Sequence, residues 1–90
     1  MNEMSLNWDD LKLFVAVARA AGLAGAATVT GKSPPTLGRR MLALEEATGN
    51  ELFHRFARGY ELTEQGTALY NRVVDLEAQI KPLMRSGSNA

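Results

Sequence analysis

The sequence lacks the residues and patterns that several classes of protein need. Its 90 residues include no cysteine, so neither a disulfide nor a zinc–thiolate site can stabilise the fold. No apolar run approaches the length of a membrane span, and the N-terminus lacks the charged-then-apolar layout of a signal peptide. Because missing cysteine is compatible with a reducing compartment, we expect a cytoplasmic protein that makes no contact with a membrane.

Groups of residues suited to catalysis or metal binding are also missing. His54 is the only histidine, and no cysteine is present to share a metal ion with it. Glu45 and Glu46 are adjacent, and adjacent side chains on a helix diverge by about 100°, so they do not form a working carboxylate pair. There is no nucleophile–base set and no glycine-rich phosphate loop. We therefore expect no enzymatic activity, no metal and no cofactor, with His54 on the surface.

Charge is balanced overall but clustered locally. Ten basic and ten acidic residues cancel, which argues mildly against non-specific binding to nucleic acid. From Lys32 to Leu44, however, there are three basic residues and no acid, and Arg55 and Arg58 follow. An electrostatic case for nucleic-acid binding therefore depends on this one region of the chain.

Hydrophobic periodicity predicts two helices before this basic region. The first covers roughly residues 8–21, with Asn7 or Asp9 as its N-cap and Gly22 as its C-terminal stop. The second is short and rich in alanine, covering roughly 23–30. Small side chains there allow another helix to approach closely.

A third helix follows a turn at Gly31 and Lys32. Ser33 is a good N-cap, and Pro34 suits the first helical position, where a missing N–H costs no internal hydrogen bond. Gly49 ends the helix, which covers about 34–48. Its inward face is predicted to consist of Leu37, Met41 and Leu44.

After Gly49 the spacing of apolar residues changes from that of a helix to that of two short β-strands. Leu52-Phe53 and the segment 60–63 are predicted to be strands, with 57–59 as the turn between them, so that a wing covers 53–63.

Thr63 is predicted to cap a last helix with an apolar stripe of heptad spacing. Pro82 is expected to end or kink this helix near Ile80. The stripe consists of Leu69, Val73, Leu76, Ile80 and Leu83.

The predicted fold is mainly α. A winged helix-turn-helix domain, with three helices and a two-stranded β wing, occupies 1–63. A linker and dimerisation helix follows over 64–85, and 86–90 is expected to be a disordered tail. Several short motifs in order resemble the N-terminal domain of LysR-type transcriptional regulators, over about Trp8 to Arg85. They are Leu11-x-x-Phe14, Ala26-Ala27, Ser33-x-Pro35, Leu44-Glu45, Gly49-x-x-Leu52-Phe53-x-Arg55 and Leu62-Thr63-x-x-Gly66.

The resemblance implies sequence-specific binding of double-stranded DNA and regulation of transcription in a bacterial cell. Family members are typically much longer, and a small-molecule effector would bind a C-terminal domain outside this chain. The chain is then either a DNA-binding fragment or an unusually short protein. Where the family usually has glutamine and serine, this chain has Pro34 and Gly38, which cannot hydrogen-bond a base through their side chains. The resemblance therefore supports DNA binding better than any particular target sequence.

The third helix is expected to enter the major groove and the wing to reach the minor groove. Arg39 is assigned to base edges, Arg40 to phosphate or the groove wall, and Arg58 to the minor groove. Arg55 either holds a phosphate or braces the wing. The alternative to DNA binding is that these residues form a solvated helix face with ordinary surface arginines. The whole predicted set is Lys32, Ser33, Pro35, Thr36, Gly38, Arg39, Arg40, Arg55 and Arg58.

The last helix is expected to form a homodimer, because a chain of this size has little other surface with which to cover an apolar stripe. In the resembling family this helix pairs antiparallel with its copy. The predicted dimer contacts are Leu69, Val73, Leu76 and Ile80. The main alternative function is a winged-helix module that binds another protein, with weak or no DNA binding. A molybdate-regulator-like relative of the same fold is a third possibility.

Overall fold

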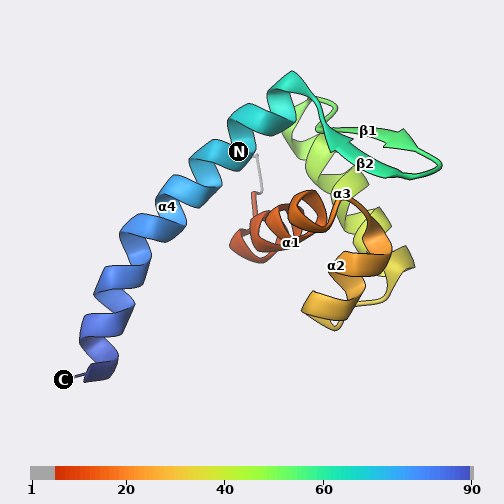
Figure 1. The fold of residues 1–90 in the computed structure, drawn as a ribbon. Coiled ribbons are helices and arrows are strands. Elements are labelled where there is room, and N and C mark those ends of the chain that lie inside the picture. Colours follow the sequence, from red (N-terminus) through yellow and green to blue (C-terminus); the bar gives the residue numbers. More distant parts are fainter. Residues whose placement is uncertain (1–5, 90) are drawn as a thin grey trace.

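The computed structural model describes the backbone of residues 6–89 and the side chains of residues 6–80. Its elements in chain order are α1 (Trp8–Ala20), α2 (Leu23–Thr30), α3 (Pro34–Thr48), β1 (Phe53–Phe56), β2 (Gly59–Leu62) and α4 (Glu64–Asn89) (Figure 1). The first three helices and the hairpin cluster together, and α4 extends away from them. This is the winged helix-turn-helix arrangement that the sequence predicts.

Both ends of α1 are set by local hydrogen bonds. The side chain of Asn7 accepts a hydrogen bond from the backbone N–H of Asp9 over 2.8 Å, so Asn7 is the N-cap. At the other end Ala21, rather than the predicted Gly22, adopts the left-handed conformation, with φ 58°. The turn closes one residue early because the N–H groups of Ala21 and Gly22 donate back to carbonyls in the last turn of α1.

The helix-turn-helix between α2 and α3 is confirmed in detail. Gly31 ends α2 in the left-handed region at φ 77°. The Ser33 hydroxyl accepts the N–H of Thr36 over 3.3 Å, and two prolines occupy the first two positions of α3. Gly49 ends α3 at φ 76°. The caps therefore determine where α3 begins and ends.

The wing is an antiparallel hairpin with a two-residue turn. Phe53 lies opposite Leu62, and Phe56 lies opposite Gly59. The predicted three-residue turn is therefore one residue too long, because Gly59 pairs with Phe56 and belongs to β2.

The hairpin docks on the turn between α1 and α2. The N–H of Tyr60 donates to the carbonyl oxygen of Ala21 over 3.0 Å. At the neighbouring Gly59, φ is 148°, and a Cβ would overlap that same carbonyl oxygen. Glycine is therefore needed at this position both for backbone conformation and for space.

A second close approach of backbone fixes the start of α4. Thr63 caps the helix, since its hydroxyl accepts the N–H of Gly66 over 2.9 Å and donates to the carbonyl of Glu51 over 2.6 Å. A Cβ at Gly66 would overlap the carbonyl oxygen of Leu52. The first turn of α4 consequently lies directly against the segment that leads into β1.

The far end of α4 differs from prediction. The helix continues past Pro82 to Asn89, so it does not end near Ile80, and residues 86–89 are helical rather than a tail. The kink near Ile80, which was the other predicted effect of Pro82, stays a prediction. A proline removes one hydrogen bond from a helix and need not terminate it. The predicted stripe residue Leu83 lies outside the part of the chain whose side chains are described.

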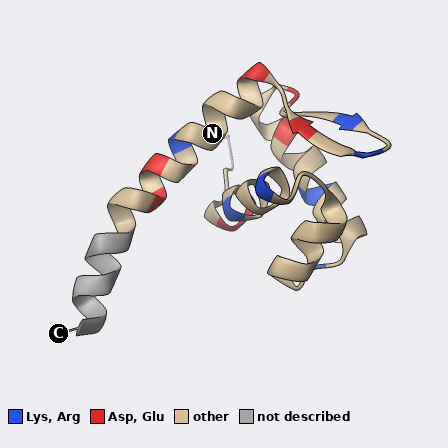
Figure 2. Cartoon of the chain, in the orientation of Figure 1, with Lys and Arg blue, Asp and Glu red and all other residues tan. Residues whose placement is uncertain are grey.

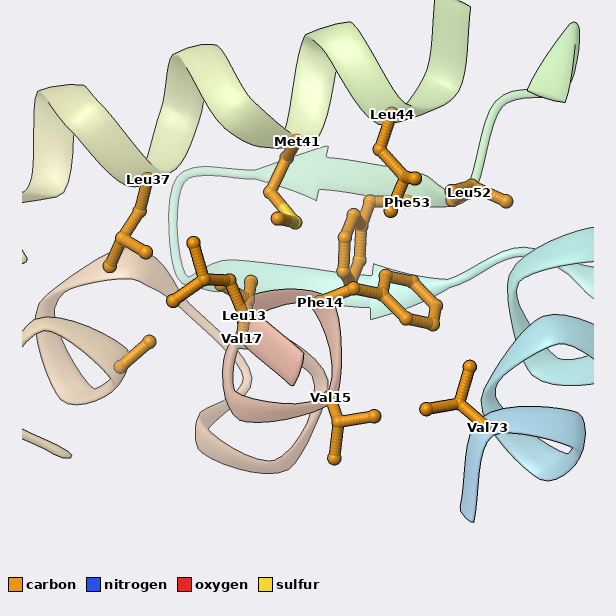
Figure 3. Close-up of a cluster of buried hydrophobic side chains, with 11 residues drawn as sticks. Leu13, Phe14, Val15, Val17, Leu37, Met41, Leu44, Leu52, Phe53 and Val73 are labelled. Atoms are coloured by element: carbon orange, nitrogen blue, oxygen red, sulfur yellow. The ribbon is translucent and has the colours of Figure 1, made fainter. Parts of the chain in front are cut away.

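The core is centred on α1 and collects side chains from every helix and from the wing (Figure 3). The predicted inward face of α3 is confirmed, since Leu37, Met41 and Leu44 are all buried. Phe14 of α1 lies 5.3 Å from Phe53 of β1, measured between ring centroids. This aromatic contact packs the wing against the same core as the helices.

Part of the apolar stripe predicted for dimerisation is buried in the core of the domain. Val73 is only 1% exposed and belongs to the core, and Leu69 packs against it. Leu76 and Ile80 remain 44% and 39% exposed. The prediction that Val73 faces a second chain is therefore wrong, because α4 crosses its own domain before it leaves it. None of the helices within residues 6–89 is long and apolar enough to cross a membrane.

Replacing Gly59 with alanine is expected to lower the free energy of unfolding by about 2–3 kcal/mol, because the new Cβ meets the Ala21 carbonyl. Urea denaturation followed by circular dichroism measures the change. Gly31→Ala is the matched control, since φ there is also positive but no atom lies within 4 Å of the added Cβ, and the expected loss is about 1 kcal/mol. Equal losses in the two variants would contradict the docking of the wing described above.

Candidate nucleic-acid interface

The N-terminal half of α3 presents a small polar cluster to solvent. Ser33 donates its hydroxyl to the Thr36 hydroxyl over 3.0 Å, and Arg39 reaches the same Thr36 oxygen over 3.5 Å. Lys32 and Pro35 are exposed beside them. The structure thus brings together five of the residues predicted to bind DNA.

The hydrogen bonds within this cluster leave the hydroxyl proton of Thr36 unused. The Ser33 oxygen accepts from the backbone N–H of Thr36, and its own proton is given to the Thr36 side chain. The Thr36 oxygen accepts from two groups, so its own hydroxyl proton is available to an acceptor outside the protein. Because two prolines remove backbone donors from this helix start, that hydroxyl and the Arg39 guanidinium are its main outward donors.

Arg39 and Arg40 have different environments despite being adjacent. Arg39 is exposed on the outer face of α3. Arg40 forms an ion pair with Asp10 of α1, thirty residues earlier, and its side chain is 40% exposed. Gly38, also in the predicted set, is half-buried against Leu23 of α2. The structure therefore separates one outward arginine from one that ties α3 to α1.

The Glu45 carboxylate joins α3 to the wing. One of its oxygens accepts the N–H groups of Leu52 and Phe53 over 2.8 and 3.2 Å. Arg55 donates to both oxygens over 3.0 and 3.2 Å, and its guanidinium lies 5.1 Å from the centre of the Tyr60 ring. Of the two roles predicted for Arg55, the structure supports the bracing of the wing.

The hydrogen bonds of this carboxylate alter its acidity. Burial raises the pKa of Glu45, but the hydrogen bonds from Arg55 and from the two backbone N–H groups lower it by more. The pKa of Glu45 therefore lies below its ordinary value. For Arg55, burial lowers the pKa, but the hydrogen bonds to Glu45 and Tyr60 and the attraction of their charges together raise it by more. Both groups are charged at neutral pH.

Arg58 occupies the tip of the wing, as predicted, and is 74% exposed. Its guanidinium lies 4.7 Å from the centre of the exposed Phe56 ring and donates to the carboxylate of Glu61 over 3.3 Å. The wing tip and the start of α3 both lie on the side of the domain away from the far end of α4 (Figure 1). Figure 2 shows basic positions on α1, on α3 and along the wing, with acidic ones prominent on the first half of α4.

Several residues that shape this surface were not identified from the sequence. Asp10 pairs with Arg40, and Glu61 pairs with Arg58. The first pair could not be found from the sequence, because its residues come together only in the folded structure. Leu42 is a large apolar residue exposed on the outer face of α3, where its spacing from Arg39 could have revealed it. His54 is exposed, as expected. Among the described residues, no group of three or more metal-ligating side chains occurs.

Comparison with known proteins finds similarity over most of the chain. The model of the bacterial regulatory helix-turn-helix proteins of the lysR family matches residues 8–67. The HTH-type transcriptional regulator BudR of Klebsiella aerogenes is 48% identical over 60 residues, which are 67% of this chain and 42% of BudR. The chain spans less than half the length of this and of two further curated regulators that it matches.

Solved structures are similar over a larger share of the chain. The crystal structure of the CbnR_DBD–DNA complex has a TM-score of 0.76 and 35% identity, over 92% of this chain and 99% of that one. The crystal structure of the BenM_DBD/benA site 1 DNA complex has a TM-score of 0.85 and 25% identity, over 93% and 94%.

The Glu45→Gln variant is expected to lose about 1–3 kcal/mol of the free energy of unfolding at pH 7, because an amide is a weaker acceptor for Arg55 and for the two N–H groups. A carboxylate with a lowered pKa contributes stability above its unfolded pKa of about 4.3 and loses it as pH falls through the lower folded value.

The stability difference between this variant and the wild type should therefore shrink below about pH 4. Urea denaturation from pH 3 to pH 8 measures it, with the exposed Glu46→Gln as control. A difference that does not depend on pH would contradict the role assigned to the charge of Glu45.

Proposed function

This chain belongs to the lysR family of bacterial regulatory helix-turn-helix proteins, and we propose on that basis that it binds double-stranded DNA sequence-specifically and thereby regulates transcription. The observation that carries the proposal is the exposed polar start of α3, which is the second helix of the helix-turn-helix. Two similar domains were crystallised as DNA complexes, which supports the same partner here. The proposal includes no chemical step and no metal, and it places the protein in the bacterial cytoplasm.

In the proposed complex α3 enters the major groove by its N-terminal half, as recognition helices do. Arg39 is the side chain that reads base edges, since a guanidinium can bond guanine through two donors. Thr36 gives its free hydroxyl proton to a phosphate, and Lys32 adds charge at the groove edge. Arg40 has a smaller part than the sequence suggested, because Asp10 already neutralises it.

The wing contributes Arg58 at the minor groove, whose negative potential is strongest where the groove is narrow. To reach DNA the guanidinium must leave the carboxylate of Glu61, although both side chains are largely exposed and their pairing is weak. Arg55 stays with Glu45 and acts by holding the wing at a fixed angle to α3. The wing therefore presents one exposed cation at its tip, Arg58, which a weak pair with Glu61 holds.

We further propose that two chains pair through α4. The first turns of the helix pack on their own domain through Leu69 and Val73, and beyond them Leu76 and Ile80 keep an apolar stripe exposed. The proposed contacts are therefore the second half of the stripe predicted from the sequence. A homodimer with two-fold symmetry would contact two half-sites of a palindromic operator.

A protein-binding module is the competing function. Zero net charge and the lack of polar side chains at Pro34 and Gly38 favour it. DNA binding through several phosphates gives a slope of log affinity against log salt of roughly −0.9 per phosphate. A salt titration with duplex DNA therefore distinguishes the two functions, since the module predicts weak binding or none even at low salt.

Arg39→Ala is expected to weaken binding to a duplex selected from a random pool by about 1–3 kcal/mol and to relax the preference at one base pair. Fluorescence anisotropy at fixed salt measures the affinity. Lys12→Ala removes one positive charge from α1 instead and should change binding far less. If Arg39→Ala binds like the wild type, then α3 is not the reader.

Leu76→Asp is expected to shift the chain from dimer to monomer, because it places a charge within the exposed stripe. Analytical ultracentrifugation measures the mass. Asn71→Asp adds the same charge to α4 about 140° around the helix from Leu76 and should leave the dimer intact. The proposed interface fails if both variants remain dimers or if the wild type is monomeric at all concentrations.

A further inference from the structure

Leu42 is the one large apolar side chain on the outer face of α3. It is 58% exposed, whereas Leu37, Met41 and Leu44 of the same helix are buried in the core. Exposure of a leucine on the surface is common and needs no explanation by itself. Leu42 differs from other exposed leucines because it lies on the outer face of α3, and that face is proposed to contact DNA.

The position of Leu42 follows from helix geometry. At 100° per residue, it lies about 20° around the axis from Pro35 and about 60° from Arg39. It is about 4.5 Å further along the axis than Arg39, which is close to the 3.4 Å rise of one base pair. Leu42 therefore continues the stripe that begins at Pro35 and passes through Arg39.

The neighbours of Leu42 restrict what it can contact. A shallow surface hollow around it is lined by Arg39, Ala43, Glu45 and Glu46 of α3 and by Gly49, Asn50 and Glu51 after it. The exposed carboxylates of Glu46 and Glu51 oppose contact with phosphate, so the apolar Leu42 is better suited to base edges than to the DNA backbone. The apolar group that bases present in the major groove is the C5-methyl of thymine.

We propose that Leu42 packs against a thymine methyl group and is a specificity-determining residue. The inference rests on the proposed DNA binding of α3 and adds to it a base identity. Pro34 and Gly38 have no side-chain donors or acceptors, so direct reading by α3 combines the hydrogen bonds of Arg39 with this apolar contact. The preferred half-site then holds a thymine within one or two base pairs of the position that Arg39 reads.

Thymine-to-deoxyuridine substitution tests the contact, since it removes only the methyl group. A duplex is first selected from a random pool with the 90-residue chain, and each thymine is then replaced singly. The wild type should lose about fourfold in affinity at one thymine per half-site, the equivalent of one methyl group returned to water. Leu42→Ala should bind the unmodified duplex more weakly by a similar or larger factor and lose nothing further at that same thymine.

Val29→Ala is the matched control, because Val29 is a branched aliphatic residue that is 78% exposed but lies on α2. It should keep the wild-type sensitivity to deoxyuridine. The inference is overturned if the wild type tolerates every substitution, or if Leu42→Ala keeps the full sensitivity. It is also overturned if Leu42→Ala changes only self-association, which would make Leu42 a protein contact.

The proposed function is assessed separately in the same experiment. Steep salt dependence together with a loss of affinity in Arg39→Ala supports DNA reading by α3, even where Leu42 and the thymine methyl prove independent of each other. Absence of any duplex binding by the wild type at low salt overturns both proposals.

Discussion

The carboxylate of Glu45 is the interaction on which the DNA-facing surface depends. It leaves α3 about 60° around the helix from Leu42 and accepts hydrogen bonds from Leu52 and Phe53, where the wing begins, and from Arg55. Two elements that follow each other in sequence are thereby held at one angle. Because the groove-facing side chains are carried on both elements, that angle determines which of them can touch the same duplex. In the proposed complex, a structural acid thus contributes to recognition without contacting DNA.

Local interactions explain why the sequence predicted the helix-turn-helix so closely. Ser33, the prolines after it and the glycines at 31 and 49 act on hydrogen bonds a few residues away, and each leaves a recognisable pattern in the sequence. The spacing of Leu37, Met41 and Leu44 likewise identifies the buried face of α3 directly. Where the prediction failed locally, at Gly22 and at the wing turn, the error was one residue.

Longer-range effects could not be predicted in this way. The pairing of Arg40 with Asp10 joins residues thirty positions apart, and no periodicity marks it. Val73 lies in a heptad stripe that looks uniform, yet its burial depends on how far α4 runs across its own domain. The close approaches at Gly59 and Gly66 also depend on segments distant in the chain. Sequence therefore predicted the elements and the buried face of α3, and the structure was needed to show which arginines and leucines have partners within the domain.

The pairing of Arg58 with Glu61 makes contact between wing and DNA an exchange of partners rather than the gain of a new one. An arginine without a neighbouring acid would be attracted by any phosphate, whatever the shape of the duplex. Here the groove must compete with a carboxylate 3.3 Å away. Because both side chains are largely exposed, the pair is weak and the bias that it introduces is small. Narrow A·T-rich minor grooves, where the potential is deepest, compete with that carboxylate by the largest margin. In this way an acid on β2 adds a modest preference for narrow grooves to a general attraction for DNA.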